Sequence, residues 1–156
     1  MGRFYVIQLS PEPVKDEFRL KGSDLYDDPA FEARADYGGD PVSDEKEVLG
    51  EIAGELKDVA TVSVKDRTVT FTDPDTLREL YARDIKNAFD EHMRKLREEK
   101  KCDWWRFHRR IEDVFGISDL FYTSGYCQKA GELVEDLVNG NIPATLHIGA
   151  ILWAHC

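Results

Sequence analysis

Residues 144–154 contain no Asp, Glu, Lys or Arg, although these four residue types make up 33% of the 156-residue chain. An uncharged segment in so highly charged a chain is expected to be buried. Its pattern predicts a buried final strand, in which Gly149 is a candidate for a bulge. A second compact apolar run, residues 3–9, contains aromatic and β-branched side chains and predicts another strand that is buried on both faces.

The segments between these two strands show helical and strand patterns. Asp73 followed by Pro74 is a favourable helix start, and apolar residues then recur at helical spacing for about seven turns. Asp103 is placed to cap the next helix, and Gly116 is placed to end it. The expected elements are helices over 44–57, 73–100, 104–115 and 124–139, and a β-hairpin made of 59–64 and 68–72.

These elements follow one another in the order β-α-β-β-α-β, with two additional helices before the last strand. The expected fold class is α+β, with a mostly antiparallel four-stranded sheet of split βαβ (ferredoxin-like) order and helices on one face. A chain of this length fits a single domain, residues 1–156. Residues 10–42 hold four prolines and many Asp, so we expect a long acidic loop there, with one short helical turn around residues 31–35.

Composition and missing motifs exclude several classes of protein. No run of eighteen apolar residues is present, so we expect no membrane-spanning helix. The start of the chain lacks a secretion signal, and the three cysteines form no CxxC pair, so we expect reduced thiols and a cytoplasmic location. No P-loop or glycine-rich dinucleotide turn is present, so we expect no cofactor. We also expect no metal, because Cys127, His147, His155 and Cys156 lack the spacing of a zinc site.

Charge is distributed unevenly along the chain, which has 21 basic and 31 acidic residues. Residues 10–58 hold fifteen acidic and six basic side chains, whereas residues 94–110 hold eight basic and three acidic ones. The overall negative charge disfavours a protein that coats duplex DNA, because phosphate binding needs a positive surface. The same charge favours fast association with a basic partner.

The acidic segment suggests a surface for binding a partner. A row of carboxylates can imitate the phosphates of nucleic acid and occupy the nucleic-acid channel of another protein. The alternative interpretation is a solubilising loop and helix face, which is ordinary in acidic proteins. The candidate partner-binding residues are Asp24, Asp27, Asp28, Glu32, Asp36, Asp40, Asp44, Glu45, Glu47 and Glu51.

The basic segment is interleaved with aromatic residues and suggests direct contact with nucleic acid as an alternative. Basic side chains would bind phosphates while Trp105 stacks on a base. The structural interpretation is that these residues form solvated helix faces, with Arg109 and Arg110 paired to the acidic loop of the same molecule. The candidate nucleic-acid-binding residues are Arg94, Arg97, Lys100, Lys101, Trp105, Arg106, Arg109 and Arg110.

These observations favour a small, acidic, non-enzymatic interaction protein. Its most concrete form is an inhibitor or regulator of a basic, nucleic-acid-handling protein, of the phage or mobile-element anti-defence type, which acts by nucleic-acid mimicry. The first alternative is a nucleic-acid-binding module that uses residues 94–110. The weakest hypothesis is a Cys/His hydrolase built on Cys127 with His147 or His108, because no nucleophile-elbow motif is present. The oligomeric state does not follow from the sequence.

Overall fold

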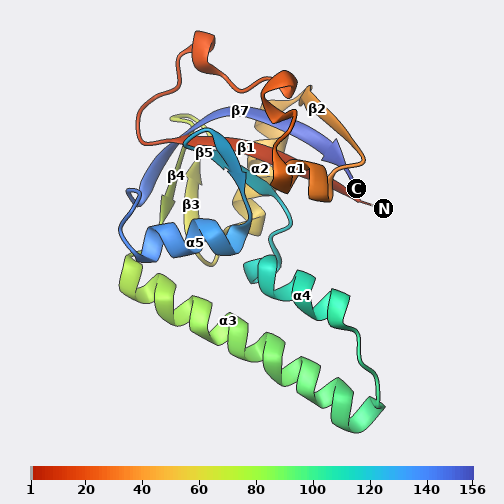
Figure 1. The fold of residues 1–156 in the computed structure, drawn as a ribbon. Coiled ribbons are helices and arrows are strands. Elements are labelled where there is room, and N and C mark those ends of the chain that lie inside the picture. Colours follow the sequence, from red (N-terminus) through yellow and green to blue (C-terminus); the bar gives the residue numbers. More distant parts are fainter. Residues whose placement is uncertain (1) are drawn as a thin grey trace.

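The computed structural model describes residues 2–156 and shows an α+β fold (Figure 1). The strands are β1 (Arg3–Ser10), β2 (Tyr37–Pro41), β3 (Ala60–Ser63), β4 (Thr68–Phe71), β5 (Leu120–Thr123), β6 (Tyr126–Gln128) and β7 (Thr145–His155). The helices are α1 (Pro29–Arg34), α2 (Glu45–Glu55), α3 (Pro74–Arg94), α4 (Trp104–Glu112) and α5 (Ala130–Val138). In the described residues all seven strands belong to one mixed sheet of order β3-β4-β7-β1-β5-β6, with β2 as a further partner of β7.

The sheet is built on β7, which has neighbours along both of its edges. On one edge it pairs antiparallel with β1, from Arg3 opposite His155 to Ser10 opposite His147. On the other edge β4 pairs with the beginning of β7 and β2 pairs with its end. β1 in turn pairs parallel with β5. The predicted strands over 3–9 and 144–154 are therefore confirmed, and they are neighbours in the centre of the sheet.

The predicted bulge at Gly149 is also present. The pairing of β7 with β1 shifts in register between Ile7 and Leu9, because β7 has one extra residue at this point. Side chains normally alternate between the two faces of a strand. The extra residue places Ile148 and Ile151, which are three positions apart, in the same core.

The side chain of Gln8 lies against this bulge. Its Oε1 accepts hydrogen bonds from the backbone N–H groups of Ala150 (3.0 Å) and Leu20 (2.9 Å), and its Nε2 donates to the carbonyl of Phe18 (2.9 Å). A Cβ atom at Gly149 would lie 2.2 Å from Gln8 Oε1, so only glycine leaves room for this side chain. One glutamine therefore connects β1, the bulge and the segment that follows β1.

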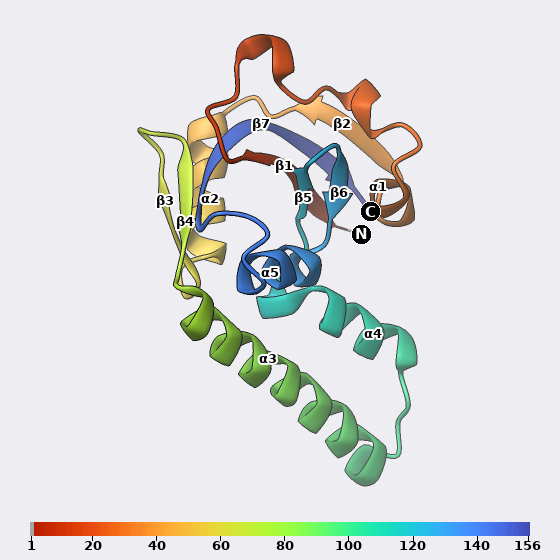
Figure 2. The ribbon, with the colours of Figure 1, turned by 60° about the vertical axis from the view of Figure 1, so that its left-hand side comes forward.

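Helices and connecting segments lie over both faces of the sheet (Figures 1 and 2). Each face carries its own apolar core. The first core includes Ile7 and Ile151 and is covered by α2, α5 and the start of α3. The second core includes Val6 and is covered by Leu20 and Leu25, together with residues of α1. Because both faces are covered, β1 and β7 are apolar along almost their whole length, which explains the uncharged runs in the sequence.

The α+β class is confirmed, but the predicted four-stranded, mostly antiparallel, ferredoxin-like sheet is not found. The described sheet is larger and mixed, and its helices cover both faces rather than one. The segment 10–42 is not a long loop, because it contains α1, β2 and two short 3-10 turns, Asp16–Phe18 and Gly22–Leu25. Its few apolar side chains are the ones that cover the second core, and these are too sparse to form a periodic pattern in the sequence.

The helix predicted over 124–139 is wrong in its first half. β5 and β6 form a hairpin there, and α5 begins only at Ala130. Ser124 and Gly125 connect the two strands and have positive φ angles of 53° and 93°, the backbone of a tight hairpin turn. The Ser-Gly pair between two apolar runs was the sequence signal for this turn, and the helical spacing of nearby apolar residues obscured it.

Residues 74–113 form a helical arm that extends from the rest of the molecule, which we call the body (Figures 1 and 2). The arm consists of α3, a π-helical turn over Lys95–Glu99 and the returning helix α4. Asp73 and Asp103 cap the two helices as predicted, accepting from Thr76 N (2.9 Å) and Arg106 N (3.0 Å). In the described residues no helix combines the length and the apolar character that a membrane span requires.

We predict that Gln8 and Gly149 are energetically coupled. Gly149→Ala should lower the free energy of unfolding by about 2 kcal/mol, because the new methyl group displaces a side chain that makes three hydrogen bonds. In a Gln8→Ala background the space is open, so the same Gly149→Ala change should cost at least about 1 kcal/mol less. Urea unfolding of the wild type, both single variants and the double variant measures this difference. Additive effects would show that Gln8 does not depend on the glycine.

Candidate functional site

Most of the carboxylates predicted to bind a partner are exposed and carry no cationic neighbour. Among residues 2–156 no ion pair involves nine of the ten candidates, and eight of these nine are exposed. These eight, which we call the acidic surface, are Asp24, Asp27, Glu32, Asp36, Asp40, Asp44, Glu47 and Glu51, and all are exposed. They do not share one face of the molecule, because α1 and α2 cover opposite faces of the sheet.

The backbone beneath the acidic surface is ordered. Asp24 accepts a hydrogen bond from Lys21 N (2.8 Å), and Asp44 caps α2 by accepting from Glu47 N (3.0 Å). The turn that carries Asp24 lies directly against β2, because a Cβ atom at Gly22 would be 2.6 Å from the carbonyl oxygen of Gly39. The carboxylates are thus presented from fixed elements rather than from a flexible chain.

Two of the ten predicted residues do not belong to this surface. Asp28 is only 8% exposed, caps α1 by accepting from Ala30 N and Phe31 N (both 3.0 Å), and also accepts from Cys127 N (2.8 Å). Asp28 therefore holds α1 against β6 and has no free carboxylate to offer a partner. Glu45 is half-buried between two cations and pairs with Arg19 and Arg67 at 2.6 Å each.

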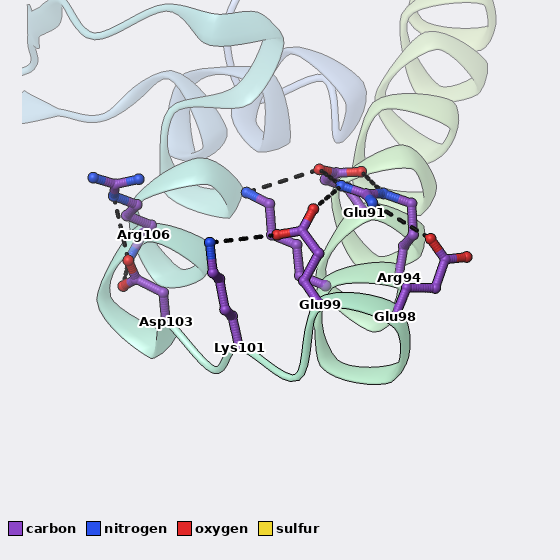
Figure 3. Close-up of polar contacts among 8 residues, drawn as sticks. Glu91, Arg94, Glu98, Glu99, Lys101, Asp103 and Arg106 are labelled. Atoms are coloured by element: carbon purple, nitrogen blue, oxygen red, sulfur yellow. Dashed lines mark hydrogen bonds and ion pairs between the residues drawn. The ribbon is translucent and has the colours of Figure 1, made fainter.

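The predicted nucleic-acid-binding cations lie on the arm, where most of them are neutralised by acidic residues of the arm itself (Figure 3). Arg94 contacts Glu91 and Glu99, both at 2.9 Å, and Glu98 at 3.5 Å. Further pairs join Lys101 to Glu99 at 3.9 Å and Arg106 to Asp103 at 3.3 Å. Of the eight candidates, only Arg97 and Lys100 are cations that make no ion pair within the described residues.

Arg109 and Arg110 are paired, but the predicted pairing with the acidic loop is wrong, because their partners are Asp113 and Asp84. Arg110 binds Asp84 of α3 through two hydrogen bonds of 2.7 and 2.9 Å, and Arg109 pairs with Asp113 at 3.0 Å. Partial burial tends to raise the pKa of Asp84, but the hydrogen bonds from Arg110 and from Phe115 N outweigh it and hold this pKa below its usual value. The Arg110–Asp84 pair ties α4 to α3, whereas the Arg109–Asp113 pair lies within α4 and its C-terminal cap.

Between α3 and α4 lies a groove of about 600 Å³ with an apolar floor and charged walls. Phe107 and His92 stack at its floor, with ring centroids 4.1 Å apart. Trp105 is 68% exposed, and the guanidinium of Arg109 lies 5.7 Å from its ring centroid. The arm thus joins aromatic and basic side chains, as predicted, but most of the candidate cations are already engaged in ion pairs.

The structure does not bring the hydrolase candidates together. Cys127 lies on β6 and His147 on β7, and the strands β5 and β1 separate them. Burial, together with the carboxylate of Asp28, raises the pKa of the Cys127 thiol to about 12, whereas a nucleophilic cysteine needs a lowered pKa. No group of three or more His, Cys, Asp or Glu residues within residues 2–156 is placed to hold a metal ion.

A buried carboxyl group that sequence reasoning missed is Asp119, immediately before β5. It is 3% exposed and accepts a hydrogen bond from Tyr5 N (2.8 Å). Burial, reinforced by the nearby carboxyl group of Glu55, raises the pKa of Asp119 to about 8. The sequence does not indicate that Asp119 is buried beside another carboxyl group, because that group belongs to Glu55 of α2, which is distant in the sequence.

No family model, curated protein or solved structure matches this chain.

We predict that stability falls as pH rises through the neutral range because of Asp119. In the folded chain this carboxyl keeps its proton up to about pH 8, whereas an unfolded Asp loses it above about pH 4. The folded state therefore binds more protons over this interval, and the free energy of unfolding should fall by up to about 1.4 kcal/mol per pH unit. Asp119→Asn should flatten this slope in urea unfolding, while the exposed control Asp58→Asn should retain it; an unchanged slope in Asp119→Asn would contradict the assignment.

We predict selective alkylation of the thiols. Cys102 is exposed and Cys127 is buried with a raised pKa, so iodoacetamide near pH 8 should modify Cys102 at least about a hundredfold faster. Peptide mass spectrometry after timed quenching measures both rates in one sample. A fast reaction at Cys127 would revive the hydrolase hypothesis.

Proposed function

We propose that this protein is a non-enzymatic inhibitor or regulator whose acidic surface binds a basic, nucleic-acid-handling protein. The observation that supports this function over direct nucleic-acid binding is the contrast in pairing between the two charged regions. The eight carboxylates of the acidic surface make no ion pair within residues 2–156, whereas five of the seven candidate cations of the arm do. Unpaired surface charge is what a partner of opposite charge can use.

The charge of the molecule divides along the same lines. The arm has eleven basic and ten acidic residues, so the remaining ten basic and twenty-one acidic residues belong to the body. An excess of one sign on a surface produces a field that attracts oppositely charged proteins and raises the rate of association. The strongest field of this molecule therefore attracts basic surfaces and repels nucleic acid.

The proposed mechanism is competition for a cationic channel. Nucleic-acid-binding surfaces use Lys and Arg to neutralise phosphates. Carboxylates on fixed elements, such as Asp36 and Asp40 on and next to β2, can engage the same cations with little loss of conformational freedom on binding. A partner occupied in this way cannot hold its nucleic acid, and the complex should weaken as salt is raised.

We predict that removal of three charges from the acidic surface weakens the complex. The partner is first captured from cells with the tagged protein, with nuclease present, and is released by salt. The triple variant Asp27→Asn/Asp36→Asn/Asp40→Asn should bind the isolated partner at least about tenfold more weakly at about 0.1 M salt. Its thermal unfolding should be nearly unchanged, since these side chains are exposed.

The matched control removes three exposed charges elsewhere, with Asp58→Asn/Glu79→Gln/Glu135→Gln, and should keep at least most of the affinity. An equal loss of affinity in both variants would show that binding depends on the net charge of the protein and not on the acidic surface. If nucleic acid is recovered, or if the partner is lost on nuclease treatment, the result would contradict the proposal. It would support direct nucleic-acid binding by the basic residues of the arm.

A further inference from the structure

A cavity of about 340 Å³ lies between α2 and the sheet, and its walls combine carboxylates with aromatic rings. Asp44, Glu47 and Glu51 line it from α2 and the N-terminal cap of that helix, and Tyr5 and Trp153 line it from β1 and β7. None of the three carboxylates makes an ion pair within residues 2–156. Aromatic walls together with unpaired carboxylates have the chemistry to receive a cationic side chain.

The carboxylates of this cavity are neighbours on one side of α2. Positions 44, 47 and 51 are three and four residues apart, so their side chains lie side by side. Asp44 has a structural role, because it accepts the capping hydrogen bond from Glu47 N (3.0 Å). Glu47 and Glu51 repel each other at this spacing, and no ion pair of the described residues offsets the repulsion. A cation bound between them would offset it.

The aromatic walls are held in place before any ligand binds. Tyr37 of β2 lies edge-on to Trp153, with ring centroids 6.0 Å apart and planes at 89°. The Tyr5 hydroxyl donates to Glu51 Oε2 (2.7 Å). Burial and this hydrogen bond raise the pKa of Tyr5 to about 12, so the phenol keeps its proton at neutral pH. A site formed in advance loses little conformational freedom on binding.

Arg3 is the only cation among the described residues that line the cavity. Its Nη2 donates to the Tyr5 hydroxyl (2.8 Å), and its guanidinium carbon lies 5.4 Å from the centroid of the Tyr5 ring. It makes no ion pair with a carboxylate within residues 2–156, and the walls hold three acidic groups against this one basic group. The cavity therefore stays negatively charged, and Arg3 shows that a guanidinium can pack against an aromatic ring at this place.

We propose that this cavity binds one arginine side chain of the basic partner, an inference that rests on the proposed function for the source of that side chain. The guanidinium stacks on Trp153 and donates to Glu47 and Glu51 together, because its planar fork carries five N–H donors. A lysine ammonium is a compact point charge without a planar face, so it fits these walls less well. The carboxylates on the α2 side of the sheet attract the partner, and the cavity fixes its position.

The first test uses a peptide and needs no partner. Trp104→Phe/Trp105→Phe leaves Trp153 as the only tryptophan of the chain, so its fluorescence reports on the cavity. Titration of this protein with the peptide acetyl-Gly-Arg-Gly-amide at low salt should give a saturable change with a dissociation constant of about 10 mM or lower. The corresponding lysine peptide should bind at least about threefold more weakly, because it lacks the planar fork.

The second test removes the paired carboxylates of the cavity. In the same background Glu47→Gln/Glu51→Gln should weaken binding of the arginine peptide at least about tenfold, since both charges that the guanidinium meets are lost. Asp27→Asn/Glu32→Gln is the matched control, because it removes two exposed carboxylates of the acidic surface that do not line the cavity. The control should keep the affinity for the peptide, and circular dichroism verifies that both variants are folded.

The absence of saturable binding would overturn the proposal, as would equal binding by Glu47→Gln/Glu51→Gln in its folded state. Equal affinity for the arginine and lysine peptides would overturn the assignment to arginine. The proposed function fails separately, if no basic partner is captured from cells. A captured partner that binds Glu47→Gln/Glu51→Gln as tightly as the wild type would support the proposed function and overturn the cavity as its arginine site.

Discussion

The pairing of β1 with β7 is the interaction on which the rest of the structure depends. These two strands contribute to both apolar cores. β2, β4 and β5 pair directly with β7 or β1, and β3 and β6 join the sheet through β4 and β5. The Gln8 side chain supports this pairing at its weakest point, where the bulge removes regular hydrogen bonds. The same side chain also accepts a hydrogen bond from Leu20 N and so fixes the segment after β1. Gln8 therefore stabilises the β1–β7 pair and also holds the segment that covers the second face of the sheet.

Once the second face is covered, the position of the acidic surface follows. Asp28 caps α1 and holds it to β6, while Arg34 at the end of α1 pairs with Asp113 at 2.5 Å and donates to the carbonyl of Ser118. A segment with few apolar residues is thus held in place by buried polar contacts. Removing one partner of such a buried pair leaves an uncompensated charge and is strongly destabilising. These contacts therefore also fix the positions of the exposed carboxylates that flank them.

Sequence reasoning found the elements with strong local signals and missed those formed by distant contacts. The uncharged run 144–154, the helix start at Asp73 and the bulge at Gly149 each depend on neighbouring residues, and all were predicted correctly. β2 contains two glycines and a proline, and its strand geometry comes from β7 rather than from its own propensity. For the site, the sequence located both charged regions, but only the structure shows that Asp28 is buried and that Arg110 is paired with Asp84.

The long separation between β1 and β7 also bears on how the chain folds. Gln8 and Ala150 are 142 positions apart, and β1 lacks its main antiparallel neighbour until β7 has left the ribosome. Proteins dominated by such non-local pairings fold slowly, and their apolar strands stay available to wrong partners in the meantime. A nascent chain therefore presents Phe4 to Leu9 without its antiparallel neighbour until the residues of β7 have been synthesised. Its yield in cells should depend on chaperones that bind extended apolar segments, more than its final stability would suggest.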